Sequence, residues 1–318
     1  MKPTPSIIFF TVSSGAGLGL LALVALADVL DAATLPGQAL WRGALLGLVL
    51  VAAGLTSSVL HLANPKNAWR SFARFRTSWL SREAVFAVAL FPVAGLYIVL
   101  VARDSGGAPR ALLALVSCAL AWAVLVSTAM IYASLKPIRQ WHTRWTPANY
   151  VLHGHWSGAL LLWSIASAYA ARVGPFLVLA LVLGLAALAA KLVYWHVIDR
   201  EADAITLERA IGVASGVHGP GPISAAHARL LDVGHSHGTF LTNEFGFQLA
   251  RRHARVLRGV ALALGFLLPL SWVAVGVSHW QTALIAAASC IMGLLVERWL
   301  FFAEAKHTVR LYHGDPRT

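Results

Sequence analysis

The chain has 318 residues, of which 58% are hydrophobic and only 12% are charged. A soluble domain carries about a quarter charged residues, so this composition excludes a soluble enzyme, a disordered tail and a secreted disulfide scaffold. The net charge of +12 does not predict a nucleic-acid partner, because Lys and Arg of membrane proteins gather in cytoplasmic loops. The composition predicts an all-α, polytopic membrane protein.

Eight apolar segments are each long enough to cross a bilayer as a helix, which takes about 20 residues. We predict spans at about 6–30, 39–62, 83–102, 111–135, 148–172, 174–197, 254–277 and 280–302. Residues 1–318 are interpreted as a single integral membrane domain, with 198–253 as its one long loop. The first segment is too long for the apolar region of a cleavable signal peptide.

An even number of spans places both termini on one side of the membrane. Without the long loop, that side holds 13 Lys and Arg, namely Lys2, Lys66, Arg70, Arg74, Arg76, Arg82, Lys136, Arg139, Arg144, Arg298, Lys306, Arg310 and Arg317. The opposite side holds 4, namely Arg42, Arg103, Arg110 and Arg172. Because positive residues accumulate in cytoplasmic segments, we expect both termini and the long loop to be cytoplasmic.

Two polar residues end neighbouring spans at the same predicted depth. His61 closes the second span and Glu83 opens the third. An imidazole and a carboxyl group at the membrane surface can hydrogen-bond a quinone and exchange protons with water. The alternatives are a histidine at headgroup level and a glutamate favoured by the helix dipole, with Ser81 as the N-cap.

A weak internal repeat suggests two parallel four-helix halves. Residues 80–86 and 241–247 both fit L-[ST]-x-E-x-x-F, four spans apart. Repeats of this kind also occur in transporters. A secondary transporter with charges at Asp28 and Lys191 and matching prolines at Pro92 and Pro269 is therefore the alternative from another functional class.

Other features predict packing rather than metal chemistry. Cys118 and Cys290 are too few for an iron–sulfur cluster, and His153 and His155 point to different faces of a helix. We therefore expect no metal site and no haem. The glycines within 15–19 lie inside an apolar span, where small residues allow close helix packing.

Four stretches resemble the membrane anchor subunit of the dimethyl sulfoxide reductase family (DmsC type). They are HLANP (61–65), RFRTSWLSRE (74–83), IYASLKP (131–137) and VERWLFFAEA (296–305). The resemblance implies an eight-helix anchor in a bacterial inner membrane, without haem, that holds a molybdopterin catalytic subunit and an iron–sulfur subunit. It would exchange electrons with ubiquinone or menaquinone, and in that family the residues matching His61 and Glu83 are tied to quinol binding.

We add Arg82, Arg76 and Ser81 to this quinone site because they are close in sequence; the arginines would hold the carboxylate and dock the partner. The predicted cytoplasmic side is closer to the related membrane subunit of cytoplasmic sulfite dehydrogenase (SoeC type). We therefore favour sulfite oxidation coupled to quinone reduction over a quinol-oxidising sulfoxide reductase. The protein alone is expected to have no turnover, because its side chains assemble no redox centre.

Overall fold

The computed structural model describes residues 3–31, 35–59, 65–200, 249–276 and 279–306, which form helices and no strand. The helices are α1 (Pro5–Val29), α2 (Gly37–Val59), η2 (Pro65–Arg74, a 3-10 helix), α3 (Trp79–Ala102), α4 (Ala108–Ala133), α5 (Trp145–Ala168), α6 (Gly174–Arg200), α9 (Leu249–Leu262), η5 (Ala263–Leu267, a π-helix), α10 (Leu268–Val275) and α11 (Trp280–Ala303). The all-α prediction is confirmed.

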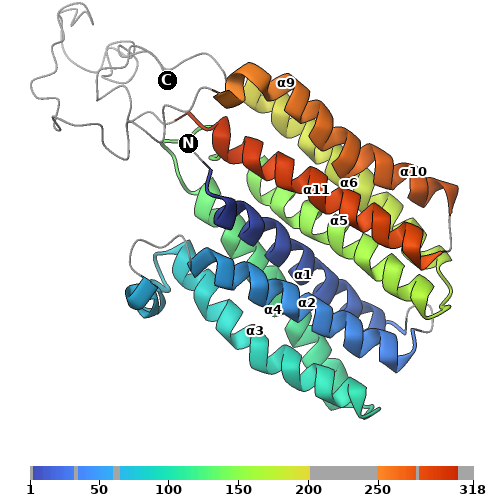
Figure 1. Ribbon diagram of the computed structural model, residues 1–318. Helices are drawn as coiled ribbons and strands as arrows, with labels where there is room; N and C mark the ends of the chain where they lie inside the picture. The colour runs from blue at the N-terminus through green and yellow to red at the C-terminus, as the bar shows by residue number, and fades with distance from the viewer. Residues whose placement is uncertain (1–2, 32–34, 60–64, 201–248, 277–278, 307–318) are drawn as a thin grey trace, which may run out of the picture.

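Seven of the helical segments in the described part of the chain are long and apolar enough to cross a membrane. One of these seven is the continuous run from α9 through η5 to α10. The eighth long helix, α5, is 24 residues long but carries buried polar side chains that lower its hydropathy. The eight predicted spans therefore correspond to these eight segments, which lie side by side in Figure 1.

The helices begin and end where local chemistry dictates. Proline occupies the first turn of α1 and of α4, where no backbone donor is needed. The hydroxyl of Ser78 accepts a hydrogen bond from the Ser81 backbone at 3.4 Å and caps α3, so Ser78 and not Ser81 is the N-cap. Pro269 lies just after the π-helical turn η5. Because proline has no backbone N–H to donate, the regular helical hydrogen bond cannot form at this position, and the wider π-turn precedes it.

The helices divide into two halves with the same pattern of neighbours. In the first half α1 packs on α2 and α4, and α3 packs on α2 and α4. In the second half α5 packs on α6 and α11, while α11 packs on α9 and α10, and α10 reaches α6. Figure 1 shows the first half in blue to green and the second in green to red. The contacts agree with the predicted four-plus-four arrangement; the second copy of the predicted motif, 241–247, lies outside the described residues.

The two halves meet along α1 and α5, whose backbones approach closely. A Cβ on Gly154 of α5 would stand 2.8 Å from the carbonyl oxygen of Gly15, and one on Gly17 would stand 2.5 Å from that of Gly47 in α2. Only glycine fits at such distances, so the predicted packing role of 15–19 is confirmed. Because α5 is enclosed by α1, α4, α6 and α11, its polar side chains are hidden from lipid.

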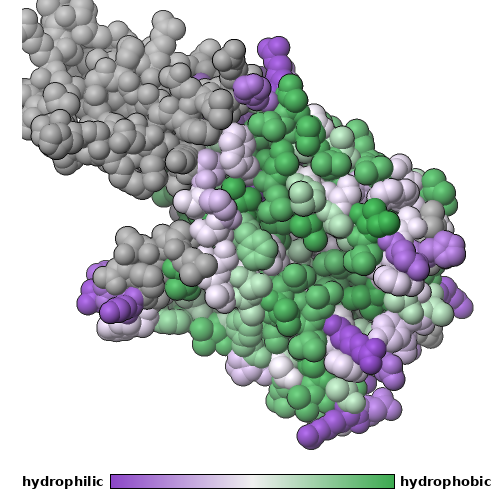
Figure 2. All heavy atoms as spheres, viewed as in Figure 1, coloured by the Kyte–Doolittle hydropathy of each residue, from purple (hydrophilic) through white to green (hydrophobic). Residues whose placement is uncertain are grey.

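The outer surface fits a bilayer. Hydrophobic side chains cover the middle of the face in Figure 2, and hydrophilic ones gather towards the ends of the helices. Exposed apolar residues such as Val88, Leu112, Val178 and Ile285 come from different helices. Such an apolar surface is suited to contact with the hydrocarbon tails of lipids.

Helix extends into both ends of the predicted long loop, since α6 continues to Arg200 and α9 begins at Leu249. An ion pair between Asp199 of α6 and Arg258 of α9, at 2.7 Å, joins the two helix ends. Near the opposite end of the bundle, Arg110 of α4 donates a hydrogen bond of 2.9 Å to Asp28 of α1. The hydroxyl of Tyr97 in α3 donates to the same carboxyl group at 3.1 Å.

Candidate functional site

Glu83 lies in the second turn of α3, at the end of the bundle where α1 begins and α11 ends (Figure 1), and only 5% of its residue surface is exposed. The hydroxyl of Thr128 in α4 donates a hydrogen bond to the Glu83 carboxyl group. The same hydroxyl also lies 3.0 Å from the Val124 carbonyl oxygen and shares its single hydrogen between the two acceptors, which fixes it on this side of α4. The carboxyl group is therefore held by a neutral partner from the adjacent helix.

The structure gives Arg82, Arg76 and Ser81 different contacts from those predicted. Arg82 donates hydrogen bonds to the carbonyl oxygens of Phe75 at 3.0 Å and Arg76 at 2.8 Å. The Ser81 hydroxyl donates to the Ser71 carbonyl oxygen. No ion pair joins either arginine to Glu83 within the described ranges. These three residues fasten η2 and the following turn to α3, beside the carboxyl group and not on it.

His61 lies in the stretch 60–64, outside the described residues. Helix α2 is described up to Val59, two residues before it, and packs against α3. The chain re-enters the described part at Pro65 and forms η2, which packs on α3. The connection that carries His61 therefore joins two elements that both contact the helix of Glu83.

Segment η2 is an exposed, amphipathic element. Its Trp69 is 66% exposed and its Phe72 is also exposed. Phe75, just after the segment, is exposed too and packs edge-on against Phe86 of α3 with 5.7 Å between ring centroids. Lys66 and Arg70 of the same segment are exposed as well. Exposed aromatic and cationic side chains on one short helix can lie in the headgroup region of a membrane or can bind a negatively charged partner protein.

Two tyrosines that were not predicted from the sequence adjoin this site. Tyr132 lies one turn beyond Thr128 on α4 and stacks on Tyr150 of α5, with 5.7 Å between centroids and 24° between planes. The spacing of Thr128 and Tyr132 at i and i+4 places both on one face of a helix, and this was the signal available in the sequence.

A second polar cluster lies in the other half. The Lys191 ammonium group of α6 pairs with Glu297 of α11, and both side chains are buried. Arg298 lies 3.5 Å from the same carboxyl group and His153 of α5 lies 3.8 Å from it. The described residues contain no group of three or more His, Cys, Asp or Glu that could hold a metal ion.

Comparisons with known proteins agree with this architecture. A family model described as "DMSO reductase anchor subunit (DmsC)" matches residues 1–303. A sulfite dehydrogenase subunit of Allochromatium vinosum is 34% identical over 339 residues, which cover 98% of this chain and 99% of that protein. A component of the anaerobic dimethyl sulfoxide reductase of Escherichia coli is 29% identical over 114 residues, 36% of this chain and 40% of that protein. The chain belongs to the family of DMSO reductase membrane anchor subunits.

Proposed function

We propose that this anchor subunit binds quinone beside Glu83 and His61 and passes it electrons from an iron–sulfur partner, which receives them from a molybdopterin subunit. The observation that carries the proposal is a buried carboxyl group held by the neutral Thr128 hydroxyl. Such a group can gain or lose a proton without breaking an ion pair. Reduction of a quinone consumes two electrons and two protons, so a carboxyl group of this kind is what the reaction needs.

The residues around Glu83 suit this role. His61 would hydrogen-bond one quinone carbonyl, and Glu83 would exchange the proton of that site. Arg82, Ser81 and the Arg76 backbone keep η2 on α3, which supports the wall of the site. The exposed cations Lys66 and Arg70 would contact the iron–sulfur partner.

Sulfite is the substrate that we propose for the assembled complex, because the similarity to a sulfite dehydrogenase subunit extends over 98% of the chain. Quinol oxidation for a sulfoxide reductase is the second candidate, supported by the shorter match to a dimethyl sulfoxide reductase component. The purified complex distinguishes them directly. Sulfite-dependent quinone reduction supports the first, and quinol oxidation by dimethyl sulfoxide supports the second.

We further propose an inner-membrane location with both termini in the cytoplasm. The support is the excess of Lys and Arg at the end of the bundle that holds the termini. Several of them are exposed, among them Arg70, Arg74, Lys136 and Arg139. Labelling of single cysteines in intact cells and in inverted vesicles tests this orientation.

The quinone site is tested with Glu83→Gln and His61→Ala in the whole complex. Each variant should abolish quinone-coupled turnover and leave dye-coupled turnover of the catalytic subunit unchanged. Asp104→Asn is the matched control, because it makes the same carboxyl-to-amide change at an exposed position at the other end of the bundle. Normal quinone turnover in Glu83→Gln would refute the site.

A further inference from the structure

We propose that the proton exchanged at Glu83 travels through the second half of the protein, along Tyr132, Tyr150, His153 and the Glu297–Lys191 pair, to a pocket beside Glu304. This inference rests on the proposed quinone site, and it assigns a role to the buried charges that the site itself does not use. The observation behind it is that these groups follow one another across adjacent helices at the same end of the bundle.

The first step leads from Glu83 to the tyrosines. Thr128 holds the carboxyl group, and Tyr132 lies one turn further along the same face of α4. The Tyr132 ring stacks on Tyr150 of α5, and the Tyr150 hydroxyl is buried without a hydrogen-bond partner in the described part of the chain. A hydroxyl group both donates and accepts a hydrogen bond, so a pair of phenols can pass a proton without carrying a charge.

The second step leads from Tyr150 to Glu297. Tyr150 and His153 share a face of α5 and line one small cavity of about 10 Å³ with Arg298, close to the least volume that holds a water molecule. The Nε2 atom of His153 and the Oε2 atom of Glu297 are buried and have no hydrogen-bond partner in the described part of the chain. Buried polar atoms are nearly always satisfied. A water molecule in this cavity, which His153 lines and Glu297 does not, would satisfy Nε2, while the Oε2 atom of Glu297 faces Nδ1 of the same ring at 3.8 Å.

Arg298 lies beside this path and supplies a fixed positive charge. Its guanidinium carbon lies 3.7 Å from the centroid of the Tyr150 ring, and one of its nitrogens lies 3.5 Å from the Glu297 carboxyl group. Arginine stays protonated in proteins, so it cannot carry the proton itself. It balances the charge of Glu297 when that group is ionised.

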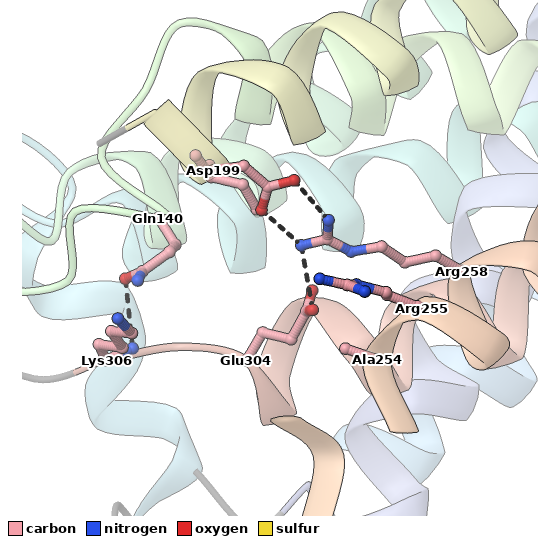
Figure 3. A pocket seen from close by; sticks show the side chains of 8 residues that line it. Gln140, Asp199, Ala254, Arg255, Arg258, Glu304 and Lys306 are labelled. Carbon is pink, nitrogen blue, oxygen red and sulfur yellow. Dashed lines mark hydrogen bonds and ion pairs between the residues drawn. The ribbon is translucent and has the colours of Figure 1, made fainter. Parts of the chain in front are cut away.

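The last step reaches the surface at a pocket of about 430 Å³ between α6, α9 and the end of α11. Figure 3 shows Glu304 in this pocket, with Arg258 bridging it to Asp199. Burial raises the pKa of Glu304, which lies just past the end of α11, so this carboxyl group takes up protons at a higher pH than an exposed one. Glu304 caps the C-terminus of α11, two helical turns beyond Glu297.

Atoms and electrons balance along this route. Sulfite and water would give sulfate, two protons and two electrons at the catalytic subunit, and iron–sulfur clusters of the partner would carry the electrons to the quinone. The quinone takes the two electrons and two protons and becomes quinol. At least one of these protons enters at the Glu304 pocket and reaches the quinone through Glu83.

The test compares Tyr150→Phe with Tyr194→Phe in the whole complex. Tyr194 is a matched control because it is also buried among the aromatic residues of this end, but its hydroxyl donates to the Gln140 carbonyl oxygen at 3.1 Å. We expect Tyr150→Phe to lower the quinone-coupled kcat about tenfold or more, as loss of a proton-transfer group does. The KM for quinone and dye-coupled turnover should stay unchanged, and the solvent deuterium isotope effect on kcat should rise.

Glu297→Gln, with the same measurements, provides a second variant on the path. An unchanged kcat and isotope effect in both Tyr150→Phe and Glu297→Gln would overturn the route. Equal losses in Tyr150→Phe and Tyr194→Phe would also overturn it, because they would reflect packing. If Glu83→Gln lowers quinone turnover while Tyr150→Phe does not, the route fails and the quinone site stands; if Glu83→Gln is silent, the quinone site itself fails.

Discussion

Removing one partner of the ion pair between Asp28 and Arg110 should destabilise the first half of the bundle by several kilocalories per mole. The side chains are 8% and 18% exposed, respectively. Arg110 makes two hydrogen bonds to the carboxyl group, and Tyr97 makes a third. The pair therefore joins α1, α3 and α4 at the end of the bundle opposite the termini.

The substitution Arg110→Leu removes two of these three hydrogen bonds and leaves the carboxylate of Asp28 buried with Tyr97 alone. Removing one partner of a buried ion pair costs about 3–5 kcal/mol. Because the guanidinium group keeps some contact with solvent, we expect the lower end, about 3 kcal/mol, which corresponds to a factor of about 150 in the folding equilibrium. The expected change is a loss of free energy of unfolding, with no change in the fold.

The assay is reversible unfolding of the purified protein in mixed micelles, followed by helical circular dichroism. The double variant Asp28→Leu, Arg110→Leu is the decisive comparison, because apolar replacement of both partners of a buried pair is often neutral. We expect it to recover most of the loss. A loss of free energy of unfolding below about 1 kcal/mol in Arg110→Leu, which is the value of an exposed pair, would show that the pair is not buried. A double variant whose loss equals the sum of the two single losses would show that the two residues do not interact.

Three further substitutions test other parts of the structure. Gly154→Leu should prevent α1 and α5 from packing, because a Cβ there already meets the Gly15 carbonyl oxygen; gel filtration should show loss of the monodisperse protein, and a normal profile would contradict the contact. Thr128→Val removes the hydroxyl that holds Glu83 and should lower quinone-coupled but not dye-coupled turnover; equal effects on both would argue against a site at Glu83. Ser78→Ala removes the N-cap of α3 and should cost about 1 kcal/mol in the unfolding assay, whereas Ser105→Ala, outside any cap, should cost less.

Much of the fold was predictable because lipid imposes simple rules on the sequence. Apolar length predicted the seven helical segments that are apolar enough to cross a membrane, and the glycines of α1 predicted a close helix contact. The polar surface of α5 is compatible with a spanning helix only because other helices enclose it, and this enclosure depends on contacts between distant parts of the chain. Hydropathy alone therefore identifies seven segments, and the eighth depends on its tertiary environment.

The candidate site was predictable in its position but not in its contacts. Adjacent spans bring the ends of α2 and α3 together, so the sequence placed Glu83 beside the connection that carries His61. The partner of the Glu83 carboxyl group is Thr128, 45 residues away, and sequence proximity wrongly favoured the neighbouring arginines. The Arg82 guanidinium group instead donates to the backbone carbonyl oxygens of Phe75 and Arg76, which the turn between η2 and α3 leaves available as acceptors.

The positions of the buried charges predict that turnover does not move charge across the membrane. Glu83, Glu297 and Lys191 belong to the end of the bundle with the termini, whereas the Asp28–Arg110 pair lies at the other end. Between them, residues 20–25 of α1 and 159–163 of α5 are apolar and buried, and an apolar region of this kind conducts protons poorly. Electrons from the partner and protons through Glu304 would then reach the quinone from the same side.

In sealed vesicles containing the complex, sulfite-dependent quinone reduction should leave a potential-sensitive dye unchanged. A dye response that an uncoupler abolishes would mean that protons cross this apolar region, and the route would have to extend to Asp28.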